Sequence, residues 1–337
     1  MADALTELLV ERDWLLLDGA TGTNLFAMGL MAGEAPELWN VDDSDKIRAL
    51  HNGFIEAGSD VVLTNSFGGS AYRLKLHDAQ NRVEELNKAA AEIARDCVDK
   101  SGRKVIVAGS VGPTGEILQP VGELSHADAV AAFEEQIAGL MAGGADVIWT
   151  ETISSEEELR AVAEAAVNQN APFCTTLSFD TAGRTMMGVT SAGYAGLAGS
   201  LPSNPIAIGA NCGTGAPDLL RTVMGISEAA PERTIIAKGN AGIPKYVDGH
   251  IHYDGTPELM ADYARLARDA GARLIGGCCG TQPEHLRAMR AALEDHRPGP
   301  RPSLDEIAAR VGAFSSADDG TGAAPAADRP RRRRRRG

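Results

Sequence analysis

Three of the five cysteines stand in glycine-rich segments, where they could meet around a metal ion. Cys212 lies within Gly209–Gly213, and the adjacent Cys278 and Cys279 lie within Gly276–Gly280. Flanking glycines let a backbone approach closely and adopt conformations that other residues avoid. Three thiolates around a zinc ion would leave one tetrahedral position open, as in catalytic zinc sites. The alternative is that these cysteines are small buried side chains.

The open position decides what chemistry such a site could perform. A thiol that binds a metal loses its proton, although a free cysteine-like thiol has a pKa near ~8.5. Zinc held by three cysteines would therefore present a substrate thiol as a nucleophile at neutral pH. An electron-rich sulfur of this kind attacks activated methyl groups. The sequence thus predicts Zn²⁺ as the cofactor. Cys97 and Cys174, on a predicted helix face and inside a predicted strand, are predicted core residues.

The elements that would position these cysteines form a repeating strand–helix pattern. Eight short β-branched or aliphatic runs predict strands at 15–18, 60–64, 104–109, 146–150, 173–179, 207–211, 234–238 and 273–276. Apolar residues at three- and four-residue spacing predict helices between them, at 44–57, 82–100, 126–142, 155–167, 216–228 and 257–270.

Eight strand–helix alternations predict an α/β protein of one domain, a (β/α)8 TIM barrel over residues 1–312. A doubly wound open sheet could also hold eight strands. However, the first strand–helix turn, Asp18–Thr23, does not match the G-x-G-x-x-G pattern. Barrel active sites lie at the carboxyl ends of the strands. Cys212 follows the sixth predicted strand and the vicinal pair follows the eighth, so both segments should open on one face.

Bulk composition indicates an ordinary globular protein, with 44% apolar and 23% charged residues. No run approaches the ~20 apolar residues of a membrane span. The first 14 residues lack the basic and apolar regions of a signal peptide. An odd cysteine count with an adjacent pair argues against a disulfide framework. These features predict a cytoplasmic protein without membrane contact.

The C-terminal segment differs in composition from the rest of the chain. Residues 313–337 are predicted to be a disordered Ala/Gly/Pro tail that ends in six consecutive arginines, 331–336. Residues 315–337 carry a net charge of +4 and the remainder carries −18, which disfavours nucleic acid as the main partner. The tail itself could contact RNA, anionic lipid or the acidic body. A homo-oligomer is compatible with the sequence, which does not define an oligomeric state.

Several motifs, in a consistent order over roughly residues 10–295, resemble the homocysteine S-methyltransferase family. Besides the two cysteine segments, they are Leu17–Thr23, Leu63–Phe67, Gly109–Pro113, Trp149–Thr152, Lys238–Gly242 and Pro283–Leu286. The resemblance implies a barrel that binds zinc through Cys212, Cys278 and Cys279.

The resemblance also implies roles for the substrate residues. Glu151 would receive the homocysteine amino group, Asp18, Gly19 and Thr64 would cradle the amino acid, and Asn211 and Asn240 would lie near the metal and the substrate. The chemistry agrees, because a carboxylate pairs with an ammonium group and glycine-rich turns offer backbone N–H groups to a carboxylate. Taken alone, Glu151 could instead be a helix-end carboxylate, and Asp18 a turn residue.

The methyl donor is implied less directly. Family members use glycine betaine, S-methylmethionine or S-adenosylmethionine, related sulfonium compounds, or a folate–cobalamin relay in far longer chains. This chain is expected to use a small donor because it has no room for relay domains. A quaternary ammonium group favours an aromatic cage, for which Trp39, Phe67, Phe26 and Tyr72 are the candidates. Trp39 could instead anchor a loop on the barrel rim.

Within the family, the chain looks most like the bacterial betaine–homocysteine methyltransferases. It departs from the animal betaine enzymes, which have tyrosines where this chain has Gly68 and Thr152. The implied reaction is methyl transfer from betaine to zinc-bound homocysteine, giving methionine and dimethylglycine. The alternatives are S-methylmethionine or dimethylsulfoniopropionate as the donor, or a non-catalytic thiol-binding barrel that serves a corrinoid partner.

Overall fold

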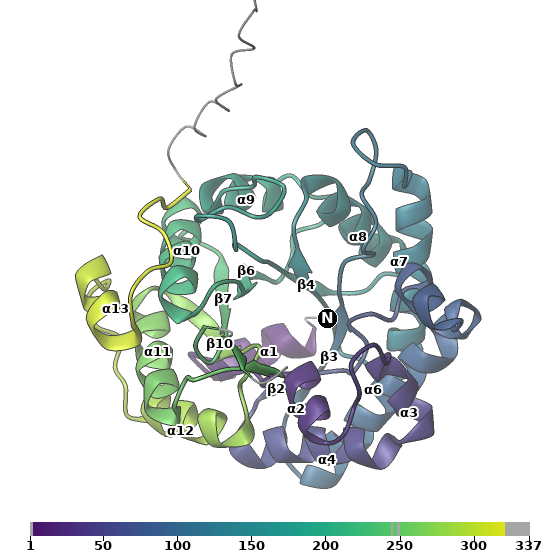
Figure 1. Ribbon diagram of the computed structural model, residues 1–337, viewed down its shortest axis with the longest axis horizontal. Coiled ribbons are helices and arrows are strands. Elements are labelled where there is room, and N and C mark those ends of the chain that lie inside the picture. Colours follow the sequence, from purple (N-terminus) through teal and green to yellow (C-terminus); the bar gives the residue numbers. More distant parts are fainter. Residues whose placement is uncertain (1–2, 244, 248–249, 321–337) are drawn as a thin grey trace, which may run out of the picture.

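The computed structural model describes residues 3–243, 245–247 and 250–320, and helices ring a central barrel of strands in it (Figure 1). Within this described part, eight parallel strands form one sheet in the order β1-β10-β7-β6-β5-β4-β3-β2. They are β1 (Leu15–Leu16), β2 (Val61–Leu63), β3 (Ile106–Val111), β4 (Val147–Ile153), β5 (Phe173–Leu177), β6 (Ala207–Cys212), β7 (Thr234–Gly239) and β10 (Ala272–Gly277). The predicted (β/α)8 barrel is confirmed, and each predicted strand overlaps one of these.

The helices alternate with the strands and cover the outside of the barrel. Their bounds are α1 (Ala4–Glu11), α2 (Thr21–Ala27), α3 (Trp39–Asp42), α4 (Ser44–Ala57), α5 (Ala71–Leu74), α6 (Val83–Ser101), α7 (His126–Ala142), α8 (Glu156–Asn168), α9 (Ser191–Ala198), α10 (Ala216–Ala229), α11 (Pro257–Asp269), α12 (Pro283–Glu294) and α13 (Leu304–Val311). The predicted bounds of α4 and α7 match. Gly58, with φ 110°, ends α4 in the left-handed conformation expected after a helix.

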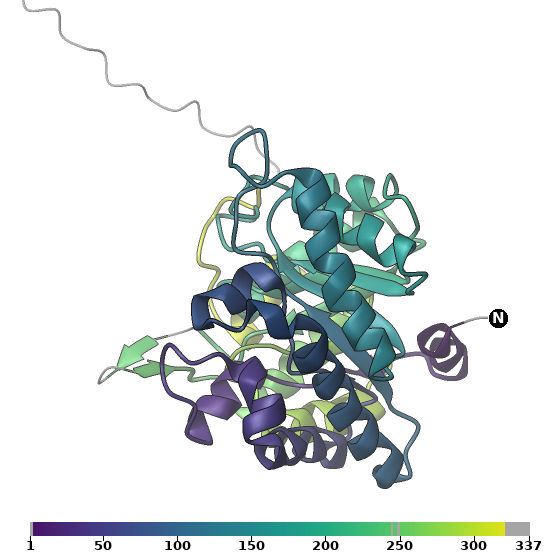
Figure 2. The same ribbon diagram turned by 90° about the vertical axis from the view of Figure 1, so that its right-hand side faces the viewer.

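The two ends of the barrel differ. Figure 2 shows α1 at one end and the hairpin of β8 (Lys245–Val247) and β9 (His250–His252) at the other. Leu5, Leu8 and Leu9 of α1 pack in one buried cluster with inward-facing strand residues such as Val61 and Trp149. Because the amino end of the barrel is filled by this apolar cluster, the carboxyl ends of the strands provide the open face.

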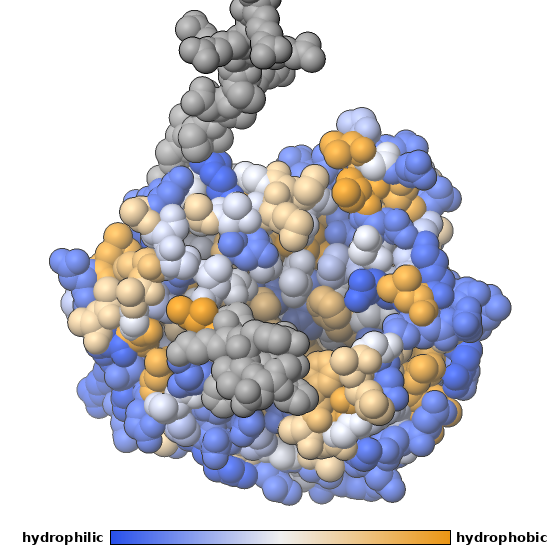
Figure 3. All heavy atoms as spheres, in the orientation of Figure 1, coloured by the Kyte–Doolittle hydropathy of each residue, from blue (hydrophilic) through white to orange (hydrophobic). Residues whose placement is uncertain are grey.

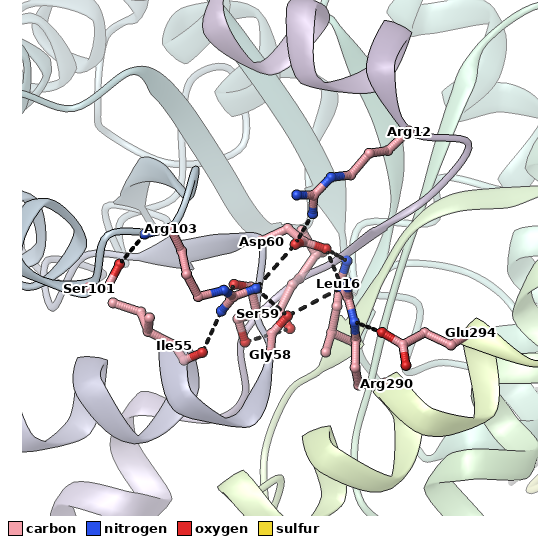
Figure 4. Close-up of polar contacts among 11 residues, drawn as sticks. Arg12, Leu16, Ile55, Gly58, Ser59, Asp60, Ser101, Arg103, Arg290 and Glu294 are labelled. Carbon is pink, nitrogen blue, oxygen red and sulfur yellow. Dashed lines mark hydrogen bonds and ion pairs between the residues drawn. The ribbon is translucent and has the colours of Figure 1, made fainter.

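The barrel closes between β1 and β2 through very little backbone pairing. A single bridge, Leu17 to Val61, joins the two strands directly. Asp60 adds to it: its N–H donates to the Leu16 carbonyl (2.7 Å), and its Oδ2 accepts from the Leu16 N–H (3.0 Å). This carboxylate is completely buried and pairs with Arg12, Arg103 and Arg290 (Figure 4). We call this contact between β1 and β2, where the barrel closes, the seam of the barrel, and Asp60 stabilises it.

The predicted domain boundary at residue 312 falls just after α13. Beyond it, the described residues 313–320 lie against α10: the Ser315 N–H donates to Asp218 (2.9 Å), and the Arg221 guanidinium lies 4.8 Å from the centre of the Phe314 ring. Residues 321–337 lie outside the described part, so disorder there stays a prediction. None of the described helices has both the length and the apolar character needed to cross a membrane.

Candidate metal and substrate site

The structure brings together the three cysteines expected to bind a metal. Cys212 ends β6, and Cys278 and Cys279 directly follow β10. The Sγ atoms of Cys212 and Cys279 are 3.8 Å apart, and all three Sγ atoms lie within 4.8 Å of one another. Tetrahedral zinc with Zn–S bonds of about 2.3 Å places its sulfurs about 3.8 Å apart. The donor type, number and spacing therefore fit a zinc ion.

Two buried asparagines hold the cysteine segments. Asn240 donates to the Gly213 carbonyl (2.9 Å) and accepts from the Cys279 N–H (3.1 Å), so it ties the two segments to each other. The Asn211 Nδ2 lies 4.0 Å from the Cys278 Sγ. Cys212 has φ 60°, a region that non-glycine residues rarely occupy. Neither asparagine lines the cavity at this site, and both contact the cysteine segments.

The sulfurs interact strongly with one another. Hydrogen bonds from Cys212 and Cys278 hold the pKa of the Cys279 thiol at about 3, whereas hydrogen bonding with Cys278 raises the pKa of Cys212. The trio by itself thus favours one thiolate stabilised by neighbouring thiols, because three adjacent negative charges repel. Ionising all three requires a cation between them, which is what a zinc ion supplies.

Polar side chains form a layer above the apolar interior of the barrel. Ser110, Glu151 and Lys238 each lie two residues beyond an inward-facing core residue on their strand, so they also face inward. The Ser110 hydroxyl donates to the Glu151 carboxylate (2.5 Å). Burial raises the pKa of Glu151 to about 7. Glu151 lies inside β4 and α8 begins at Glu156, so Glu151 is not a helix-end residue.

Asp18 has a different setting from the one expected of a residue that contacts substrate. Its Oδ2 accepts from the Leu63 N–H (2.7 Å), and its Oδ1 lies 3.0 Å from the Lys238 Nζ. Asp18 does not line the cavity, whereas Gly19, Thr64 and Lys238 do. Sequence reasoning did not assign Lys238 to the site. Lys238 could have been predicted as a site residue, because it lies one residue before the end of a strand and within a motif of the family.

A single cavity of about 360 Å³ joins these groups. It opens on the face shown in Figure 3, which is hollowed near its centre. All three cysteines, Glu151 and Lys238 line it. This volume falls within the range of small-molecule sites.

The aromatic residues of the cavity are only partly the expected ones. Phe67 and Phe26 line it, and so does Tyr253, which sequence reasoning missed. Trp39 does not line the cavity: it packs on the core at the rim, and Lys46 Nζ lies 4.1 Å from the centre of its ring. Tyr72 is also outside the cavity. Trp39, the first residue of α3, therefore lies outside the cavity.

A buried carboxylate from the same loop was also missed. Glu37 lines the cavity, although its exposed fraction is only 4%. Its Oε1 accepts from the Gly68 N–H (2.7 Å), and burial raises its pKa. No sequence signal marked Glu37, because it lies in a short 3-10 turn, Pro36–Leu38, between the regular elements.

Comparisons of both the sequence and the structure with known proteins find homocysteine methyltransferases and a methionine synthase. The sequence profile described as homocysteine S-methyltransferase matches residues 15–293. Methionine synthase of Mycobacterium tuberculosis is 31% identical in an alignment of 292 residues that covers 82% of this chain and 24% of that protein. The chain thus spans less than a quarter of the length of this relative. The homocysteine methyltransferase MmuM of Escherichia coli superposes over 86% of this chain and 99% of its own. Its metallated form gives a TM-score of 0.72 at 25% identity, and its oxidized form gives 0.71 at 26%.

Proposed function

The chain belongs to the homocysteine S-methyltransferase family, and from this premise we propose that it transfers a methyl group from betaine to the thiol of homocysteine. The products are methionine and dimethylglycine, and the cofactor is Zn²⁺. One observation carries the proposal: three cysteine sulfurs at the spacing of zinc ligands line the same cavity as a buried carboxylate, Glu151.

Cys212, Cys278 and Cys279 would hold the zinc ion, which when bound supplies the positive charge that keeps a substrate thiol ionised. The chain's own residues orient the amino acid. Asp18 and Lys238 neutralise each other at 3.0 Å, so an ionised Glu151 gives this layer a net negative charge. That charge favours the ammonium group of homocysteine. Backbone N–H groups in the glycine-rich turn at Gly19, which lines the cavity, can receive its carboxylate.

Aromatic side chains support a quaternary ammonium donor. Phe26 and Phe67 line the cavity, and the faces of aromatic rings attract cations. Holding the methyl group in line with the sulfur accelerates its transfer, because the orientation is fixed before the reaction. S-Methylmethionine and dimethylsulfoniopropionate share the positive charge and are the nearest alternatives to betaine.

A second candidate is a barrel that receives its methyl group from a partner protein. The match to methionine synthase favours it, because the sequence identity there is 31% and this chain corresponds to less than a quarter of that protein. In this case the three cysteines and Glu151 would bind the same amino acid, and small donors would not react.

The test is donor-resolved methionine production. Purified full-length chain with one equivalent of zinc is incubated with homocysteine and, separately, with betaine, S-methylmethionine or dimethylsulfoniopropionate. We expect methionine and dimethylglycine in equal amounts with betaine. Methionine from a sulfonium donor alone would replace betaine by that donor. Homocysteine binding without methionine from any small donor would favour the partner-dependent barrel.

Glu151→Gln is expected to weaken homocysteine binding by about 2 kcal/mol or more, because a buried ammonium group loses its partner. The pH dependence should change as well. With a pKa of about 7, raised by burial, Glu151 is ionised above pH 7 and protonated below it. Its contribution to binding is therefore present above pH 7 and lost as the pH falls through that value.

Calorimetric titrations of homocysteine from about pH 5.5 to about pH 8.5 measure this effect. A substrate thiol that ionises on the metal makes the affinity rise with pH in both proteins. The quantity of interest is thus the difference between the wild-type and Glu151→Gln profiles. Glu157→Gln, at an exposed position of α8, is the matched control and should leave the profile unchanged. Parallel profiles for Glu151→Gln and wild type would mean that Glu151 does not pair with the ammonium group.

A further inference from the structure

Glu37 combines deep burial, an acidic side chain and a place in the cavity that the three cysteines line. Building on the methyl transfer proposed above, we propose that Glu37 and Phe67 form the subsite that selects a positively charged methyl donor. The cationic nitrogen or sulfur of the donor would lie between the Glu37 carboxylate and the face of the Phe67 ring. Both side chains line the cavity that the three cysteines also line.

The local contacts of Glu37 do not explain why a charged residue is there. Its carboxylate accepts hydrogen bonds from the backbone N–H groups of Gly68 and of Glu37 itself, and among the described residues it takes part in no ion pair. Arg73 and His77 attract it only from a distance, and burial outweighs them in raising its pKa. Burying an unpaired carboxylate is costly. A cation from outside the protein that binds beside Glu37 would favour the ionised carboxylate, whereas an amide would accept the Gly68 hydrogen bond without attracting that cation.

The carboxylate is held in a fixed position. Asn65 donates to the Pro36 carbonyl (2.7 Å), and Asn40 donates to the Asn65 carbonyl (2.8 Å), so the turn that carries Glu37 is tied to the carboxyl end of β2. A Cβ at Gly68 would lie 3.0 Å from the Glu37 Oε1. The Glu37 carboxylate therefore occupies space that is free only because residue 68 is a glycine.

The ring of Phe67 is packed on one side only, since the residue is 38% exposed. It lies close to the backbone of Gly112, where an added Cβ would be only 2.5 Å from a ring carbon. The Gly112 N–H also donates to the Phe67 carbonyl (2.9 Å). Because Gly68 follows Phe67 and binds Glu37, the ring and the carboxylate are fixed relative to each other. A preorganised pair of this kind recognises a compact cation, through charge on one side and the aromatic face on the other.

The charge balance of the reaction predicts which kinetic constant Glu37 controls. The homocysteine sulfur forms a bond to the methyl carbon, the bond from that carbon to the donor nitrogen or sulfur breaks, and the electron pair stays with the donor atom. The donor thus loses its positive charge as the methyl group leaves. Glu37 therefore stabilises the bound donor at least as strongly as the transition state, so its loss should raise the KM of the donor without lowering kcat.

Glu37→Gln tests this directly, because glutamine keeps the hydrogen bond from Gly68 and removes only the charge. With the zinc-loaded protein and saturating homocysteine, we expect the donor KM to rise at least about tenfold and kcat to change less than about threefold. Homocysteine binding should be unaffected. Glu34→Gln is the matched control, since Glu34 is an exposed glutamate of the same loop that lies outside the cavity. Gly68→Ala, which crowds the carboxylate, should also raise the donor KM.

Two further measurements separate this inference from the proposed function. Iodomethane is a neutral methylating reagent and should methylate bound homocysteine equally fast in wild type and Glu37→Gln. Tetramethylammonium, titrated calorimetrically, should bind the wild type at least about tenfold more tightly than the variant. Equal donor KM values would overturn the inference while the methyl transfer stands. If no cationic donor reacted, the proposed function would fail. In that case the tetramethylammonium titration still tests the subsite: equal binding by wild type and Glu37→Gln would overturn it, and weaker binding by Glu37→Gln would support it.

Discussion

Replacing Cys212, Cys278 or Cys279 by alanine is expected to abolish zinc binding and methyl transfer together. The protein would supply three zinc ligands, and the loss of one would leave only two thiolates to hold the ion. Zinc sites of this kind contribute free energies of order 10 kcal/mol, so the loss of one ligand should weaken zinc binding by at least about a thousandfold. Zinc content after dialysis and methionine production measure the two effects.

Cys97→Ala is the control for these variants. Cys97 is a buried cysteine of α6 and is not among the cavity-lining residues. This variant should keep one zinc ion per chain and full activity. If all three site variants retained stoichiometric zinc, the three sulfurs would not be its ligands, and their convergence would have to serve another purpose.

Asp60→Ala is expected to cost about 3–5 kcal/mol of unfolding free energy, because it leaves buried charges without their partner. Three arginines converge on this carboxylate, and its Oδ2 accepts the Leu16 N–H at the seam between β1 and β2. We expect the lower end of that range. The side chains of Arg12 and Arg103 are 37% and 34% exposed and can turn towards water.

Urea denaturation followed by circular dichroism gives the unfolding free energy. Asp96→Ala is the control, because Asp96 also pairs with two basic side chains, Arg48 and Lys100, but at the surface. Surface pairs contribute little, so this variant should unfold at the wild-type denaturant concentration. An Asp60→Ala protein as stable as Asp96→Ala would show that backbone pairing alone closes the barrel. Folded Asp60→Ala protein should still bind zinc, since Asp60 is not part of the cavity.

The barrel and the meeting of the cysteines could be predicted because they follow from periodic features. Short β-branched runs separated by helix-length segments mark each strand, and parallel strands bring their carboxyl ends to one face. Cys212 ends its strand and the vicinal pair directly follows its own, so the convergence of the carboxyl ends is enough to bring them together. The family and the fold are confirmed, and Cys97 and Cys174 are buried as predicted.

What could not be predicted depends on side-chain direction and on loops. Asp18 follows a strand, but its pairing with Lys238 required the register across the barrel. Glu37 and Trp39 are two residues apart, in a short turn and at the start of α3, yet Glu37 lines the cavity and Trp39 does not. No periodicity distinguishes such neighbours. The loop is fixed by long-range hydrogen bonds, such as the one from Asn65 to Pro36, which a single sequence does not reveal.

The location of Asp60 has a consequence for how this protein can diversify. The seam and the packed leucines of α1 hold the barrel together at one end, whereas Glu37 and Phe67 belong to short segments at the other. Substitutions in those segments leave the fastening of the seam untouched. The donor subsite proposed above can therefore be altered by a few loop substitutions that leave the closure of the barrel intact.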